Sequence, residues 1–329
     1  MQSYLTSLGA SIGIVTIGAT ACLAGPLDWK VVPADAEWVI HVDVERIVKS
    51  TLLEAVSGAI DLDGKMEEMQ QLGMDLREDV YSVTAYGWGK VESHDLVVVV
   101  DGSGRIAEAI SKLAEHEGDI QVTEANGRTY YDAGAKGEGH VFAVMSEADG
   151  STRVIASTTR EAVDKAAERR SRDRAPVVGD GPVGGSLVFI SAMDLKKMVP
   201  HNGNDPHAKL VEQSEQFQFE VSERGENIAV RMNVSIIDSE RTQDVVDLMQ
   251  GLLAFGRMAF RDNEEMRPIA DMASHVQISS QNSKVQITLD APADQIAKLL
   301  EHLDDHDHHQ DDDRDDRGHH EDDDHEDRD

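Results

Sequence analysis

The chain contains one cysteine, few aromatic residues and no excess of positive charge. Because Cys22 is the only cysteine among 329 residues, the chain can form neither an internal disulfide nor a metal site of several thiolates. Lys and Arg number 31 against 63 Asp and Glu, which gives a formal net charge of −32. Such a field repels nucleic-acid phosphates and anionic lipids and favours metal cations or basic partners. We therefore expect no nucleic-acid binding.

Signatures of familiar enzymes are also missing from the sequence. It contains no Gly-x-Ser-x-Gly element for a serine nucleophile and no His-Glu-x-x-His element for a zinc protease. Gly102 and Gly104 follow an apolar run and match only part of a dinucleotide-binding pattern, midway through their module. A plain turn, with Ser103 or Asp101 capping the next helix, is the preferred interpretation. We favour a protein that is not an enzyme, and an enzyme with an unrecognised site stays open as an alternative.

The longest apolar stretch lies at the N-terminus, over residues 8–27. Its second half contains small residues such as Ala19, Ala21 and Ala24, as a secretory cleavage site does, so residues 1–24 are predicted to be a signal peptide cleaved before Cys22 or Gly25. Lipid attachment to Cys22 and a retained membrane anchor are the alternatives, since 20 apolar residues can just span a bilayer. The prediction is an exported protein, periplasmic or in the cell envelope, that contacts membrane only through this segment if the segment is retained or lipidated.

Strand and helix patterns are mixed along the remaining chain. Period-two alternation predicts a strand from Trp38, helical spacing predicts a helix over residues 105–116, and Asn126-Gly127 predicts a hairpin turn. Hairpins among helices indicate an α+β fold with mainly antiparallel sheets. Two modules of mainly antiparallel sheet with packed helices are expected over residues 31–170 and 186–303, with an Arg-, Gly- and Pro-rich linker over residues 171–185.

Each module begins with a strand that leads into a similar short motif. Asp43-Val44-Glu45-Arg46-Ile47-Val48 and Asp194-Leu195-Lys196-Lys197-Met198-Val199 share an Asp, two charged residues and flanking apolar positions. Either an internal duplication or chance explains the similarity. The opening "VPADAEWVIHVDVERIVKSTLLEAV" also resembles the start of a loose group of uncharacterised exported bacterial proteins. This resemblance implies export and an unknown function, and carries no site residue.

Two groups of polar residues in the body are candidates for a site. His41 and Asp43 lie on the same face of their predicted strand, as metal ligands or a proton shuttle would, but the solvent face of a half-buried strand is the preferred interpretation. His201, Asp205 and His207 share one loop without the spacing of an established ligand motif. We therefore expect no catalytic and no cofactor-binding residue in the body.

The C-terminal tail, residues 304–329, holds fifteen acidic and three basic residues, a net charge of −12. An eleven-residue unit repeats in it, "HHQDDDRDDRG" from His308 and "HHEDDDHEDRD" from His319. Such a segment lacks the apolar surface that offsets ordering entropy, so it is predicted to be disordered. Imidazole suits Zn, Ni and Cu, and carboxylates can complete the shell. The predicted metal ligands are His302, Asp305, His306, His308, His309, His319, His320 and His325.

These patterns together predict an exported, non-catalytic protein whose Asp/His-rich tail binds divalent transition metals. The alternative is a cell-envelope scaffold or ligand-binding protein whose tail only keeps it soluble or binds basic partners.

Overall fold

The computed structural model describes most of the body of the chain. The described residues are 27–56, 70–71, 73–89, 96–116, 120–133, 141–146, 150–168, 182, 185–193, 214–261 and 266–299. Within these ranges, no helix is both long enough and apolar enough to cross a membrane.

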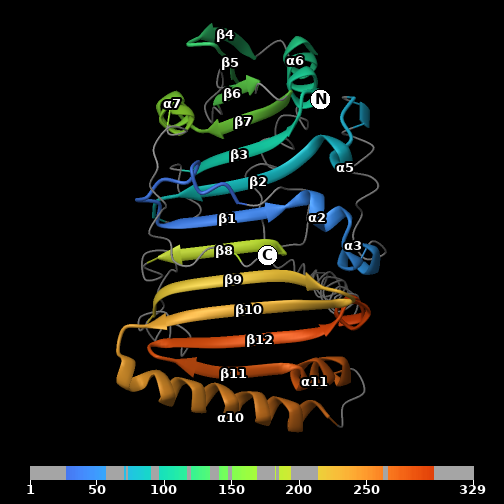
Figure 1. Ribbon diagram of the computed structural model, residues 1–329, viewed down its shortest axis with the longest axis vertical. Helices are drawn as coiled ribbons and strands as arrows, with labels where there is room; N and C mark the ends of the chain where they lie inside the picture. The colour runs from blue at the N-terminus through green and yellow to red at the C-terminus, as the bar shows by residue number, and fades with distance from the viewer. Residues whose placement is uncertain are drawn as a thin grey trace, which may run out of the picture.

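The described strands form one twelve-stranded antiparallel sheet, in the order β11-β12-β10-β9-β8-β1-β2-β3-β7-β6-β5-β4 (Figure 1). In chain order the strands are β1 Trp38–Asp43, β2 Val80–Gly87, β3 Leu96–Ser103, β4 Gln121–Ala125, β5 Arg128–Asp132, β6 Val141–Ser146, β7 Ser151–Ser157, β8 Ser186–Met193, β9 Ser214–Arg224, β10 Asn227–Ile236, β11 Val276–Gln281 and β12 Lys284–Pro292. The helices are α2 Val44–Val48, α3 Thr51–Val56, α5 Leu76–Asp79, α6 Arg105–His116, α7 Arg160–Glu168, the 3₁₀ turn η2 Ser239–Arg241, α10 Thr242–Phe260 and α11 Arg267–Ser274. Residues 293–299, at the end of the described chain, are also helical. The α+β prediction is confirmed.

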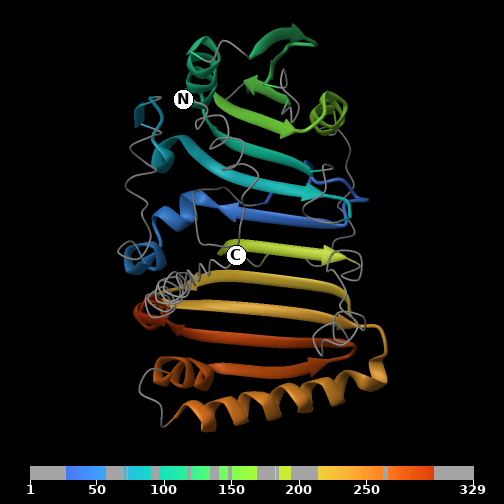
Figure 2. The ribbon, with the colours of Figure 1, turned by 180° about the vertical axis from the view of Figure 1, so that it is seen from behind.

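The two predicted modules share this one sheet, because β1 pairs with β8 from Trp38↔Ala192 to Val42↔Val188. In Figures 1 and 2 these two strands lie near the middle of the stack. Most of the predicted linker, residues 171–185, lies outside the described residues, so the domain boundary stays a prediction.

The chain follows the same path on both sides of the β1–β8 junction. The spatial order β1-β2-β3-β7-β6 on one side corresponds to β8-β9-β10-β12-β11 on the other, and β4 and β5 extend only the first side. In both halves a helix leads from the third of these strands to a later hairpin, α6 after β3 and α10 after β10. This correspondence favours the internal duplication over chance, although Asp194 itself lies outside the described residues.

Apolar residues cover both faces of the first half of the sheet. On one face, Val39 and Val97 pack with Val163 of α7 and with Val31 of the segment before β1. On the other, Ile40 and Val98 pack with Ile106 of α6. The core strand β1 is therefore buried on both faces, which corrects the sequence-based interpretation of a half-buried strand with one solvent face.

Local turn chemistry follows the sequence closely. Asn126 and Gly127 join β4 to β5 with φ angles of 54° and 72°, the left-handed pair that a two-residue hairpin turn requires, so that predicted turn is confirmed. At the start of the helix that follows β10, Asp238 accepts a hydrogen bond from the Glu240 N–H and caps the 3₁₀ turn that leads into α10.

Candidate functional site

Four neighbouring strands bring polar side chains into one line across the sheet. Asp43 of β1 lies opposite Ser82 of β2, Ser82 lies opposite Asp101 of β3, and Asp101 lies opposite Arg153 of β7. Directly paired residues point to the same face, so these four side chains share the face that also carries His41 and Thr84. We call Asp43, Ser82, Asp101 and Arg153 the polar row.

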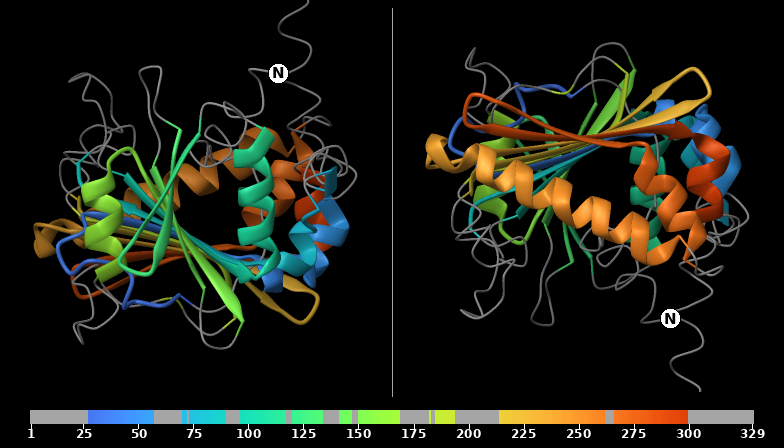
Figure 3. Two further views of the ribbon diagram at one scale, coloured as in Figure 1. Left: turned by 90° about the horizontal axis from the view of Figure 1, so that it is seen from above. Right: turned by 90° about the horizontal axis from the view of Figure 1, so that it is seen from below.

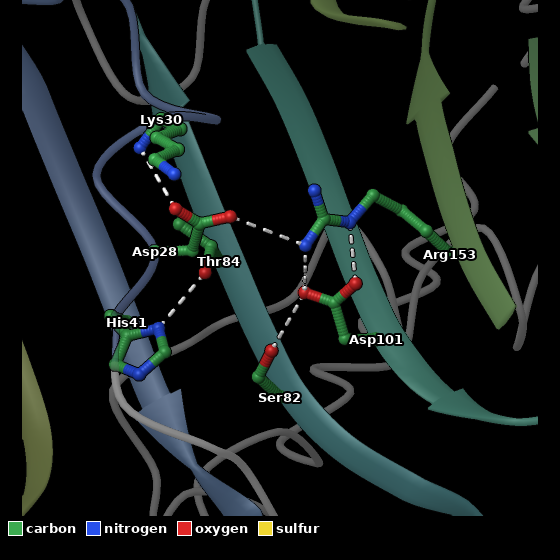
Figure 4. Close-up of polar contacts among 7 residues, drawn as sticks. All are labelled: Asp28, Lys30, His41, Ser82, Thr84, Asp101 and Arg153. Carbon is green, nitrogen blue, oxygen red and sulfur yellow. Dashed lines mark hydrogen bonds and ion pairs between the residues drawn. The ribbon is translucent and has the colours of Figure 1, made fainter. Parts of the chain in front are cut away.

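The guanidinium of Arg153 is the electrostatic centre of the row (Figure 4). Its Nε and Nη2 donate to Asp101 at 2.5 and 2.9 Å, and Ser82 Oγ donates to the same carboxylate at 3.1 Å. Nη2 also lies 3.6 Å from Asp28 Oδ2, a residue of the segment before β1. The Arg153 side chain is only 8% exposed. Two carboxylates thus neutralise a buried cation, a geometry that stabilises the ionised groups.

Asp28 connects the N-terminal segment to the sheet through this cation. Its other oxygen, Oδ1, accepts the Lys30 N–H at 3.0 Å, which fixes the turn in which Asp28 lies. Val31 and Val32 follow directly and are buried in the core beneath. The ion pair and the apolar contacts therefore hold the same short segment on the same face of the sheet.

His41 forms a separate buried contact next to the row. Its Nδ1 lies 2.9 Å from Thr84 Oγ1, and both residues are almost fully buried. Figure 4 shows the imidazole directed at Thr84 and the Asp101 carboxylate at Arg153. The expectation that His41 and Asp43 face solvent is wrong, because both side chains are almost fully buried, on the face of β1 where Val39 packs with the segment before β1 and with α7.

Asp43 caps a helix within the row. Its Oδ1 accepts the Arg46 N–H at 2.9 Å and its Oδ2 lies 3.0 Å from Arg46 Nε, so the carboxylate stabilises the first turn of α2. Burial raises the pKa of Asp43 from 3.8 to about 6, and the contacts with Arg46 offset only part of that effect. A carboxyl with a pKa near 6 can exchange a proton at mildly acidic pH, so Asp43 can take up or release a proton in that range.

The raised pKa of Asp43 predicts a specific dependence of stability on pH. The folded protein binds this proton more tightly than the unfolded chain, so the contribution to stability is full below pH 3.8 and is lost as the pH rises through about 6. Asp43→Asn keeps a capping oxygen and cannot titrate. Its unfolding free energy should therefore rise relative to the parent by about 1–3 kcal/mol between pH 4 and pH 7.

Urea unfolding of the parent and the variant at several pH values measures this difference. Asp238→Asn, at a capping carboxylate whose side chain is 51% exposed, controls for the loss of a capping charge. A difference between Asp43→Asn and the parent that stays constant over this pH range would contradict the prediction.

The Gly102-x-Gly104 turn packs tightly against a neighbouring helix end. A Cβ on Gly102 would overlap the Asp79 carbonyl oxygen and Ile106 Cδ1, so this glycine permits a close approach of backbones. Ser103 Oγ accepts the Arg105 N–H at 3.2 Å and donates to Asp79 Oδ1 at 2.6 Å. Ser103, rather than Asp101, caps the start of α6, which agrees with the plain-turn interpretation.

The predicted metal ligands of the tail, from His302 to His325, lie outside the described residues, as do His201, Asp205 and His207. Within the described ranges, no group of three or more His, Cys, Asp or Glu residues is placed to hold a metal ion. The metal site therefore stays a prediction about the tail.

Sequence reasoning missed Arg153, Asp101 and Ser82 as partners. Each stands in an ordinary strand pattern, and the pairing of β3 with β7 is what joins Asp101 to Arg153, 52 residues later in the chain. An isolated acid and an isolated base on two apolar strands were the only available signal.

No family model matches the chain, and no curated protein matches it. Solved structures of TP0453 are similar to it in part. Crystal form III of TP0453 is 12% identical to this chain, with a TM-score of 0.48. The match covers 84% of this chain and 98% of the TP0453 chain. Crystal form I has 13% identity and a TM-score of 0.46 over the same shares. A likeness of this extent carries no inference about function.

Proposed function

We propose that the protein is an exported, non-catalytic protein of the cell envelope whose C-terminal tail binds divalent transition metals. The observation that carries this proposal is the composition of residues 304–329, where six histidines alternate with fifteen acidic residues. Histidines clustered in a flexible acidic chain offer shared, exchangeable sites of modest affinity to Zn, Ni or Cu.

The geometry of the body supports a scaffold rather than a reaction site. The cation of Arg153 is neutralised by Asp101 and Asp28, and Asp79 accepts hydrogen bonds from Ser103 Oγ and the Asp75 N–H. These buried charges are engaged in holding strands, a helix end and the N-terminal segment together. We therefore assign ligand binding to the tail.

The helix of residues 293–299, which precedes the tail, leads to a second expectation: metal binding should lengthen this helix. Residues 293–299 are helical, and His302, Asp305, His306 and His309 would share one face if the helix continued at the same spacing. Carboxylates at Asp304, Asp305 and Asp307 would oppose this continuation, since each is unfavourable at the negative helix end by about 0.3–1 kcal/mol. A bound cation neutralises them, so we expect metal binding to extend the helix.

Titration of the protein with Zn²⁺ tests the proposal. Calorimetry should detect binding to the full chain and none to a chain that ends at Leu303, with a gain of helical signal in far-UV circular dichroism for the full chain only. Binding should weaken between pH 7 and pH 5, because protonated imidazole cannot ligate.

The matched control replaces the six tail histidines by Gln and keeps every acidic residue. If this variant binds Zn²⁺ as well as the parent, the carboxylates alone bind it and the histidine sites are wrong. If the parent itself does not bind Zn²⁺, the metal proposal is wrong, and the tail keeps the protein soluble or binds basic partners.

Export is tested independently of metal. The apolar stretch and the small residues in its second half predict that the chain purified from its native host begins near Cys22 or Gly25. Intact-mass spectrometry measures this start, and an added lipid mass on Cys22 would identify the anchored form. A chain that still carries its first twenty residues would contradict cleavage.

A further inference from the structure

The described sheet ends at β11, and part of the backbone of this edge strand points away from the sheet. A two-residue turn joins β11 to β12, with Gln281 opposite Lys284. The pair next to such a turn is hydrogen-bonded, and bonded and non-bonded pairs alternate along an antiparallel ladder. The N–H and C=O groups of Val276, Ile278 and Ser280 therefore point outward, where a further strand would pair.

Two side chains of α10 donate hydrogen bonds to these outward carbonyl groups. Gln250 Nε2 donates to the Ile278 carbonyl oxygen at 3.0 Å. Arg257 Nη2 donates to the Val276 carbonyl oxygen at 3.2 Å, and the same guanidinium donates to the Ala273 carbonyl oxygen shortly before β11. Gln250 and Arg257 thus occupy acceptors that an added strand would need.

The sequence of α10 places both donors along this edge. Gln250 and Arg257 are seven residues apart, or about two turns, so they lie on the same side of the helix. Val246 and Met249 lie one turn before Gln250 or beside it, and they pack with Val285 of β12. α10 runs below β11 in Figure 1 and lies in front of that end of the sheet in Figure 3, right. A narrow apolar contact and two polar side chains therefore hold α10 beside β11.

The corresponding edge in the other half of the sheet pairs with a hairpin. β6 has the same place in the strand order of the first half as β11 has in the second. Its outer side pairs antiparallel with β5, from Thr129↔Val144 to Asp132↔Val141, and β4 continues that hairpin. An edge of this kind therefore accepts strands in one half, whereas α10 lies along it in the other.

β11 itself lacks the residues that commonly protect an edge strand. Its sequence, Val-Gln-Ile-Ser-Ser-Gln, contains no charged residue and no proline. Its register with β12 is continuous from Val276 to Gln281, without a bulge. Edge strands usually carry Lys, Pro or a bulge, or are covered by a helix, because these features prevent pairing with another chain. For β11, only the covering helix is present among these devices.

We propose that the outer edge of β11 is a strand-binding site that α10 keeps covered, so that β11 of a second copy cannot pair with it. Two uncovered copies would pair through main-chain hydrogen bonds, and the uncharged strands would bring no like charges together. The hydrogen bonds from Gln250 and Arg257 are the specific part of this cover, because they occupy the acceptors themselves.

Gln250→Leu combined with Arg257→Met tests the proposal, since the new side chains are of similar length but cannot donate. This variant should self-associate at a concentration at least about tenfold lower than the parent, because two main-chain acceptors become available. Sedimentation velocity in about 0.5 M NaCl measures this, since the Debye length of about 4 Å screens the net charge of −32. Circular dichroism checks that the variant is folded.

Gln243→Leu combined with Arg261→Met is the matched control. It makes the same two replacements and the same change of charge at exposed positions in and directly after α10. Gln243 bonds the side chains of Ser280 and Asp247 rather than the edge carbonyls. The control should associate as the parent does. Equal association of both variants would show that added apolar side chains cause it, and would overturn the proposal.

Ser280→Pro assigns the association to β11. The Ser280 N–H points outward, so proline there removes no bond to β12 but blocks an added strand. Combined with Gln250→Leu and Arg257→Met, it should return association to the level of the parent. Association that persists would place the contact on another surface and overturn the proposal.

A folded Gln250→Leu, Arg257→Met variant that associates no more than the control would also contradict the proposal. If that variant does not fold, Gln250→Leu alone, at an exposed position, is measured against Gln243→Leu alone. It should shift association in the same direction by a smaller factor, and no shift would again overturn the proposal. None of these outcomes depends on the metal tail.

Discussion

Arg153→Met should lower the free energy of unfolding by about 3 kcal/mol, since breaking a buried ion pair leaves an uncompensated carboxylate. Asp101 is only 25% exposed and would lose both of its Arg153 donors, and Asp28 would lose its contact with the sheet. Because Asp28 belongs to the segment that carries Val31 and Val32, the variant should also loosen that segment. Urea unfolding measures the first effect, and hydrogen exchange of residues 27–36 measures the second.

A second substitution separates charge from packing. In Arg153→Met with Asp101→Asn, no full charge is left buried at that pair, so the double variant should be more stable than Arg153→Met alone. Lys49→Met is the matched control: its ion pair with Glu45 is 2.6 Å long but both side chains are more than half exposed, and its loss should cost no more than about 1 kcal/mol. Equal losses for Arg153→Met and Lys49→Met would contradict the assigned role of the polar row.

Gly102→Ala should lower the free energy of unfolding by about 2–4 kcal/mol, because overpacking against fixed backbone forces strands and helix apart. The added Cβ would overlap the Asp79 carbonyl and Ile106 Cδ1, where β3 passes the end of α5 and the start of α6. Asp79 is itself buried and bonded to Ser103, so neither neighbour can move freely. Thermal or urea unfolding measures the loss.

Gly104→Ala, two residues further on, is the control for this substitution. A Cβ at Gly104 would lie 3.5 Å from the Gly150 carbonyl oxygen, an ordinary contact, and Gly104 is exposed. We expect a change of less than about 1 kcal/mol, in either direction. If both alanine variants lose stability equally, or Gly102→Ala loses none, the close approach at Gly102 is wrong. The pair also tests whether the Gly-x-Gly turn is structural rather than a phosphate site.

The two halves of the sheet share a strand order, and they differ at their outer ends. The first half ends in the extra hairpin β4–β5, whereas the second half ends at β11, beside α10.

The sequence by itself determined the elements whose signals are local. The hairpin turn at Asn126-Gly127 and the helix over residues 105–116 depend on residues a few positions apart, so their signals are visible in the chain. The α+β class follows from the same local patterns. The metal tail and the leader are predictions of this kind too, since composition alone carries them.

Only the tertiary structure decided what is paired across long distances. The sequence could not show which elements pack on the face of β1 that carries His41 and Asp43, where burial raises the pKa of Asp43 to about 6. Nor could it show that β3 lies beside β7, which turns Asp101 and Arg153 into an ion pair. The physical reason is that a strand pattern specifies which side chains share a face but not which strand lies next to it, and burial and charge pairing depend on that neighbour.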